Sequence, residues 1–171
     1  GCLAGMAPDL DVLIQSNEDP ILFLEFHRQF THSLIFIPIG ALVVASALFL
    51  FFKKTLAFNV VYLAALLGYA THALLDACTS YGTLLFWPFS DVRIAWNNVS
   101  VVDPLFTVPA LILVICAISL KKRLYTALAL TWCFLYLMLG FIQHERTYRA
   151  AMEIANERQH SPQRLTLKPS F

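Results

Sequence analysis

The chain has 171 residues, enough for one domain, and it is unusually apolar, with 58% hydrophobic and only 13% charged residues. Soluble domains carry about 25% charged residues, so too few charges are present to cover a water-facing surface, and part of the chain must face lipid. The formal net charge is +1 and the sequence holds no basic patch, which argues against nucleic acid as a partner.

The N-terminal segment combines an apolar opening with a pair of aspartates. Residues 1–7 are small and apolar, like the end of a helix that starts before this sequence, so we expect a truncated transmembrane span there. Pro8 ends any preceding helix and favours an extended chain, in which Asp9 and Asp11 point to the same side. Paired carboxylates attract divalent cations and can bridge two of them. A solvated acidic turn is the alternative.

A second polar group precedes the first long apolar run. It contains His27, Arg28 and His32. Both histidines could reach a cation held by the aspartates, and the guanidinium of Arg28 could bind an anionic group such as a phosphate. The alternative is an interfacial cluster that contacts lipid head groups. We favour metal binding for His32 and include His27 as a further ligand.

Four apolar runs are long enough to cross a bilayer, which requires about 17–25 residues. Inside lipid every backbone N–H and C=O group must be paired within its own segment, so each run predicts a helix. The runs are residues 33–52, 55–71 (continuing as helix to Asp76), 104–120 and 124–143. The predicted fold is therefore an all-α, polytopic transmembrane bundle with four full spans and a fifth that is truncated at the N-terminus.

The short links between these runs indicate which helix ends share a side of the membrane. Residues 53–54 and 121–123 are short and basic, so each joins an antiparallel hairpin and marks the cytoplasmic side. The segments that carry aspartate and histidine then lie together on the extracytoplasmic side. Basic residues after position 145 argue weakly for the opposite orientation. Residues 1–144 form the predicted transmembrane domain, and residues 145–171 form a predicted extramembrane helical tail that leads to a further segment.

Two more motifs stand at the ends of the predicted helices. His72 and Asp76 are one turn apart on one helix face, a spacing at which a nitrogen and an oxygen can bind one metal ion. The alternative is that His72 caps polar backbone and Asp76 faces water. Asp103, followed by Pro104, is placed to cap the third helix. Capping alone accounts for Asp103, so a ligand role there is an addition.

Together these motifs predict a site for one or two ions of zinc or manganese at one membrane face. A bound ion acidifies water and stabilises charge on a phosphoryl or carbonyl oxygen, which favours a hydrolase. The substrate would be a phosphoester or ester carried on a lipid, because the site opens at head-group depth. The rival interpretations are a non-enzymatic protein that binds or transports a divalent ion, and a metal that only clamps helices. The predicted metal ligands are Asp9, Asp11, His27, His32, His72, Asp76 and Asp103, and the predicted catalytic residues are Asp11 and Asp76, as candidate bases, with Arg28 as the anion-binding group.

The same motifs resemble a family of bacterial inner-membrane proteins described as predicted membrane-bound metal-dependent hydrolases. The resemblance runs to about Thr107 and rests on PDLD (8–11), HRxxTHS (27–33), HxLLDxxTxYG (72–82), WPFS (87–90) and DPLFT (103–107). It implies a place in the bacterial cytoplasmic membrane, a lipid or lipid-linked substrate, and a lid formed by Tyr81, Gly82 and residues 87–90. The ligands that it implies are Asp9, Asp11, His32, His72 and Asp76, with His27 and Asp103 as additions.

Overall fold

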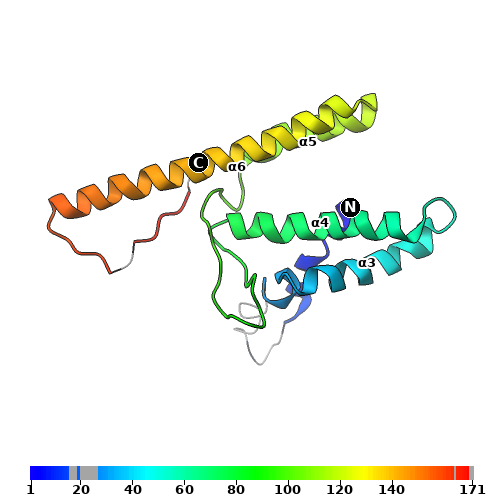
Figure 1. Cartoon of the computed structure of the whole chain (residues 1–171), viewed down its shortest axis with the longest axis horizontal. Helices are drawn as coiled ribbons and strands as arrows, with labels where there is room; N and C mark the ends of the chain where they lie inside the picture. Colours follow the sequence, from blue (N-terminus) through cyan, green and yellow to red (C-terminus); the bar gives the residue numbers. More distant parts are fainter. Residues whose placement is uncertain (16–18, 20–26, 164, 170–171) are drawn as a thin grey trace. The chain divides into compact units, whose positions relative to one another are not determined.

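The computed structural model describes residues 1–15, 19, 27–163 and 165–169, which fall into two compact units. Unit 1 comprises Gly1–Ala77 and Tyr81–Ala95, and unit 2 comprises Cys78–Ser80 and Trp96–Phe171. Each unit is built around a helical hairpin, α3 with α4 in unit 1 and α5 with α6 in unit 2 (Figure 1). The elements of unit 1, where η denotes a 3-10 helix, are α1 (Cys2–Gly5), η1 (Pro8–Leu13), η2 (Phe30–His32), α3 (Phe36–Phe52) and α4 (Phe58–Cys78).

The core of unit 1 lies between α3 and α4 and is made mostly of small side chains. Ala41 and Ala45 of α3 and Ala65 of α4 are completely buried there. The ring of Tyr69 packs directly on Gly40, where a Cβ would lie only 2.6 Å from the Cζ atom of the ring. Small residues let the two helices approach closely, as is usual for helices that pack in membranes.

The N-terminal segment of unit 1 is held against α4 by a contact between backbones. A Cβ added to Gly68 would collide with the carbonyl oxygen of Gly1, and one added to Gly5 would lie 3.2 Å from the carbonyl oxygen of Gly68. Ala4, between the two N-terminal glycines, is completely buried. This close approach delivers the next element, η1, to the C-terminal half of α4.

The loop after α4 returns to the segment that precedes α3. The backbone N–H of Leu84 donates to the carbonyl of Arg28 at 3.0 Å, and the N–H of Leu34 donates to the carbonyl of Leu85 at 3.0 Å. Thr83 and Ile94 exchange two backbone hydrogen bonds of 2.9 and 2.8 Å, which close the loop on itself. These bonds fix the polar residues around Arg28 and the loop to one another.

Unit 2 consists chiefly of α5 (Pro104–Leu120) and α6 (Arg123–Glu157). The indole N–H of Trp132 on α6 donates to the carbonyl of Phe106 on α5 at 3.1 Å. Gly140 lets the loop before α5 approach α6, because a Cβ there would collide with the carbonyl oxygen of Asn98.

The all-α prediction is confirmed, since the described residues hold two isolated bridges and no strand. All four predicted helices are present. The first begins three residues later than predicted, at Phe36, and the third has the predicted bounds. α6 runs without interruption past residue 144, so the predicted tail helix is its continuation; the division into domains at residue 144 stays a prediction.

The helices differ in their ability to cross a membrane. α4, with 21 residues, and α6, with 35, are long and apolar enough to do so, whereas α3 and α5 are apolar helices of 17 residues each. Large apolar side chains remain exposed on these helices, among them Phe51, Ile118 and Leu130. Exposed apolar surface of this extent is typical of contact with lipid. The structure supports two candidate spans, and the count of four or five spans stays a prediction.

Candidate metal centre

Four donor atoms from three elements of unit 1 converge. They are Oδ1 of Asp9 on η1, Nε2 of His32 at the end of η2, and Nε2 of His72 and Oδ2 of Asp76 on α4, and all lie within 4.8 Å of one another. We call this group the quartet. Among the residues that the structure describes, no other group of three or more histidine, cysteine or acidic side chains converges in this way.

The spacing of the quartet fits a tetrahedral cation. The four nitrogen-to-oxygen separations are 3.2 Å (His32 to Asp76), 3.3 Å (His72 to Asp76), 3.3 Å (His72 to Asp9) and 3.6 Å (His32 to Asp9). Ligand bonds of about 2.0–2.1 Å around a tetrahedral zinc ion place neighbouring donor atoms about 3.3–3.4 Å apart. Three of these four separations are close to the tetrahedral value and the fourth is slightly longer, so the quartet could hold a metal ion of this size.

The quartet is buried on one side and open on the other. His32 is completely buried and Asp76 is 9% exposed, so the alternative in which Asp76 faces water is excluded. The side chain of Asp9 is 48% exposed. Water or a substrate can therefore approach the quartet beside Asp9.

The prediction that Asp9 and Asp11 point the same way is wrong. Residues Pro8–Leu13 form a 3-10 helix instead of an extended chain. With about three residues per turn, side chains two positions apart differ by about 240° in direction. Asp9 consequently joins the quartet, while Asp11 points elsewhere and its side chain is completely buried.

Asp11 has hydrogen-bond donors of its own. Its Oδ1 atom lies 2.8 Å from Nδ1 of His27, and its Oδ2 atom accepts from the backbone N–H of Arg28 and from the hydroxyl of Thr31, both at 2.8 Å. Asp11 and His27, both predicted ligands, thus pair with each other and are not members of the quartet. The positive φ of Arg28 (59°) turns its N–H toward Asp11.

The guanidinium of Arg28 lies against the quartet. Its Nε atom is 3.2 Å from Oδ2 of Asp76, and its Cζ atom is 4.9 Å from the centre of the Tyr81 ring. Arg93 stacks on Tyr81 as well, at 5.3 Å, and donates to the carbonyls of Gly82 and His27. The sequence offers no signal for Arg93, because its partners are distant in the chain.

Asp103 belongs to unit 2, where its predicted capping role is confirmed. Oδ1 accepts from the backbone N–H of Phe106 at 3.1 Å, and both carboxylate oxygens accept from the hydroxyl of Tyr136, at 3.1 and 2.9 Å. These donors engage both carboxylate oxygens, so capping and the bond to Tyr136 explain why an aspartate stands here. A ligand role for Asp103 stays a prediction.

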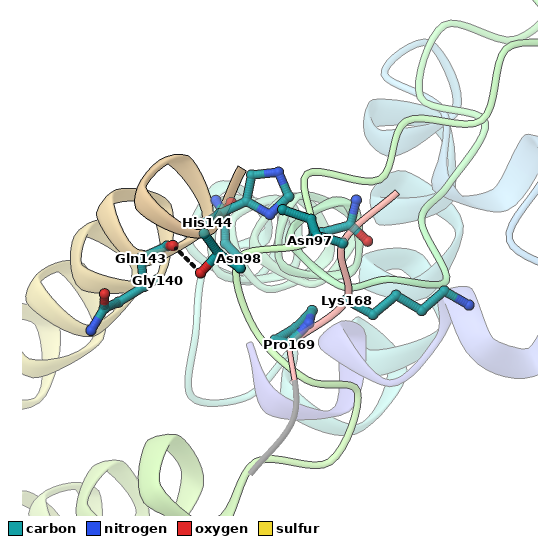
Figure 2. A pocket seen from close by; sticks show the side chains of 9 residues that line it. Asn97, Asn98, Gly140, Gln143, His144, Lys168 and Pro169 are labelled. Atoms are coloured by element: carbon teal, nitrogen blue, oxygen red, sulfur yellow. Dashed lines mark hydrogen bonds between the residues drawn. The ribbon is translucent and has the colours of Figure 1, made fainter. Parts of the chain in front are cut away.

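Unit 2 also contains a cavity of about 440 Å³ (Figure 2). It is lined by the carboxamides of Asn97, Asn98 and Gln143 together with His144 and Lys168. Because no carboxylate of the described residues lines it and a lysine does, it is unsuited to a divalent cation.

Comparison of the sequence with known proteins supports the membrane location that the apolar helices indicate. The Bacillus subtilis (strain 168) protein YfhP, described as uncharacterised, is 30% identical over 103 residues, which are 60% of this chain and 31% of YfhP. The matched part therefore spans less than a third of that relative. No solved structure matches the chain. Residues 1–147 match the family described as YdjM inner membrane protein, and the chain belongs to this family of membrane proteins.

Proposed function

We propose that the protein is a membrane-embedded, metal-dependent hydrolase that cleaves a phosphoester or an ester of a lipid-linked substrate at the membrane surface. The observation that carries this proposal is the convergence of two imidazole nitrogens and two carboxylate oxygens, from Asp9, His32, His72 and Asp76, within 4.8 Å. Packing alone gives no reason to bring two carboxylates together at a largely buried site, because their charges repel.

The residues fit a divalent cation by chemistry as well as by spacing. Two imidazoles and two carboxylates suit zinc or manganese. Nε2 of His32 is buried and makes no well-directed hydrogen bond among the described residues, although Oδ2 of Asp76 lies 3.2 Å away and buried polar atoms normally have such a bond. The imidazole of His27 and the carboxylate of Asp11 contact each other, so they are not available as further metal ligands. The four atoms of the quartet are enough for one ion. A bound cation would acidify a water molecule and polarise a phosphoryl or carbonyl oxygen.

One member of the quartet and one side chain next to it would act on the substrate. Asp9 is the exposed carboxylate, so we assign its second oxygen, Oδ2, which is not part of the quartet, as the base that would accept a proton from the attacking water. Arg28 would hold the anionic group of the substrate through its guanidinium, which Tyr81 and Asp76 orient.

A lipid-linked substrate is supported by an apolar groove in unit 1. The groove has a volume of about 270 Å³ and an almost wholly apolar lining, which includes Phe36, Gly40 and Val44 of α3 as well as Asp11 and Thr31. An acyl chain would lie along α3 with its head group near Arg28. In this proposal all four long helices span the bacterial cytoplasmic membrane, with the short basic links inside and the quartet on the extracytoplasmic side.

A second candidate function is a structural metal clamp. Four protein donors without a water position are typical of closed structural zinc sites, and the quartet would then only join η1, η2 and α4. The exposure of Asp9 favours the hydrolase, because an open side admits water.

The test is metal analysis of the purified protein followed by assay of phosphorylated lipids and lipid esters in nanodiscs. We expect about one zinc or manganese ion per chain and metal-dependent release of the head group. His72→Ala and Asp76→Ala should abolish both, whereas Asp91→Asn, an exposed aspartate of unit 1, should change neither. A wild type that binds metal but cleaves none of these lipids would support the clamp, and full activity of either alanine variant would contradict the proposal.

A further inference from the structure

A chain of three hydrogen-bonding side chains connects Asp11 to the imidazole of His32. The hydroxyl of Thr31 lies 2.8 Å from Oδ2 of Asp11 and 2.9 Å from Nδ1 of His32. Thr31 and His32 are 8% and 0% exposed, and the side chain of Asp11 is completely buried. Water therefore has little access to these contacts, and the three groups must satisfy one another.

The number of available protons determines the direction of these bonds. An ionised carboxylate only accepts, and a threonine hydroxyl has a single proton to donate. If that proton goes to Asp11, the Thr31 oxygen must accept a proton from His32. We propose that Thr31 is a positioning residue that fixes His32 as the tautomer protonated on Nδ1, and that Asp11 acts through Thr31.

Asp11 is itself held in place, so it can impose this direction. Its two oxygens are fixed by Nδ1 of His27 and the backbone N–H of Arg28, both at 2.8 Å. Its Oδ2 atom is 3.6 Å from Nδ1 of His32, too far for a direct hydrogen bond. The hydroxyl of Thr31 is therefore the group that transmits the orientation.

The tautomer determines whether Nε2 of His32 offers a lone pair or a proton to the other three members of the quartet. With the proton on Nδ1, Nε2 carries a lone pair that faces Oδ2 of Asp76 at 3.2 Å and Oδ1 of Asp9 at 3.6 Å. Three lone pairs at this spacing repel one another; the Arg28 guanidinium, 3.2 Å from Oδ2 of Asp76, offsets part of this repulsion, and a cation between the three atoms would remove the rest. The inference rests on the proposed metal site and adds that the imidazole is oriented before the metal binds, through a hydrogen bond on its second nitrogen.

The test separates the tautomer from metal binding. Metal-free protein labelled with ¹⁵N-histidine is studied by NMR in detergent at about pH 8, above the usual pKa range of imidazole. His32 is identified as the signal set that disappears in His32→Gln. We expect a protonated Nδ1 and an unprotonated Nε2 in the wild type. We call the hydrogen-bonded series Asp11–Thr31–His32 the relay. A proton on Nε2, or on both nitrogens, would overturn the relay even if the protein binds zinc.

Variants of Thr31 then test its effect on zinc affinity. Thr31→Val keeps the shape of the side chain and removes the hydroxyl, so we expect zinc affinity to fall by about 10–100-fold and the Nδ1 tautomer to lose its preference. Thr31→Ser keeps the hydroxyl and should restore both. Thr83→Val is the matched control, because Thr83 is completely buried in unit 1 and its hydroxyl has no hydrogen-bond partner among the described residues.

The outcomes distinguish failure of the relay from failure of the proposed function. If the wild type has the Nδ1 tautomer but binds no zinc or manganese, the metal site is wrong and the relay stands. If zinc binds and Thr31→Val keeps full affinity, the relay is wrong and the metal site stands. If Thr31→Val does not fold, the tautomer of His32 in the wild type and the zinc affinity of Thr31→Ser still decide whether the relay is correct.

Discussion

Nε2 of His72 lies 3.3 Å from Oδ1 of Asp9, although the two residues are 63 positions apart in the chain. The contact joins a 3-10 helix near the N-terminus to the C-terminal half of α4, and Asp76 and His32 complete the group around it. Asp9 is the most exposed member, so a substitution there can change metal binding with the least effect on folding.

Replacement of Asp9 should weaken metal binding without unfolding the protein. Asp9→Asn removes a charged donor from a half-exposed position, so zinc affinity should fall by more than about 10-fold, at least the effect of losing an outer hydrogen-bond partner. The melting temperature in the presence of a chelator should change little. Isothermal titration calorimetry and thermal unfolding in detergent measure the two quantities. Asp91→Asn is the control; unchanged zinc affinity of Asp9→Asn would remove Asp9 from the site.

Removal of the metal should destabilise the folded protein. A ligand that binds only the native state adds stability, roughly 2.7 kcal/mol at a free concentration of 100 times Kd. We expect zinc to raise the melting temperature of the wild type and a chelator to reverse the effect. In His72→Ala the melting temperature should not respond to zinc. An equal response in both proteins would mean that zinc binds elsewhere.

Close packing of the N-terminal segment on α4 should matter for the metal site. Gly68→Ala places a methyl group against the carbonyl oxygen of Gly1 and must push α1, and with it Asp9, away from α4. We expect weaker zinc binding, even though alanine favours a helix over glycine by about 1 kcal/mol. Calorimetric zinc affinity compared with that of wild type tests this expectation; a variant with native affinity would show that η1 is placed by other contacts.

The cap of α5 should stabilise unit 2 without affecting the quartet. Tyr136→Phe removes the hydroxyl that donates to Asp103, a bond to a charged group, and should cost roughly 1.5–3 kcal/mol of unfolding free energy. Tyr125→Phe, on the same helix, is the control. Unfolding by denaturant in detergent gives the stability difference. The zinc affinity of Tyr136→Phe should equal that of the wild type, and a large loss would give Asp103 a role in the metal site after all.

The proposed orientation can be tested with single cysteines introduced after the four native cysteines, of which Cys2 is exposed, are replaced by serine. Lys54→Cys, in the short basic link between α3 and α4, should react with a membrane-impermeant thiol reagent only after the membrane is opened. Asp91→Cys, in the polar loop of unit 1, should react in intact cells. Both positions are exposed in the structure, so accessibility of the side chain does not limit the reaction. The opposite labelling pattern would place the quartet on the cytoplasmic side.

The helices were predictable because long apolar runs allow no other structure in lipid. The pairing of His72 with Asp76 was predictable as well, since it depends only on the pitch of one helix. The different directions of Asp9 and Asp11 were not, because two residues after a proline fit an extended chain and a 3-10 helix equally well. The stacking of Arg28 and Arg93 on Tyr81 joins distant segments, and no local pattern encodes such a contact.

X-ray absorption at the zinc edge of the purified protein in detergent tests the central claim most directly. The claim predicts one zinc ion per chain, two imidazole nitrogens and carboxylate oxygens in the first shell at about 2.0–2.2 Å, and no sulfur. Loss of one imidazole from the spectrum of His32→Gln would assign that ligand. Sulfur at about 2.3 Å, or a wild-type protein that retains no zinc or manganese when purified with it, would contradict the claim.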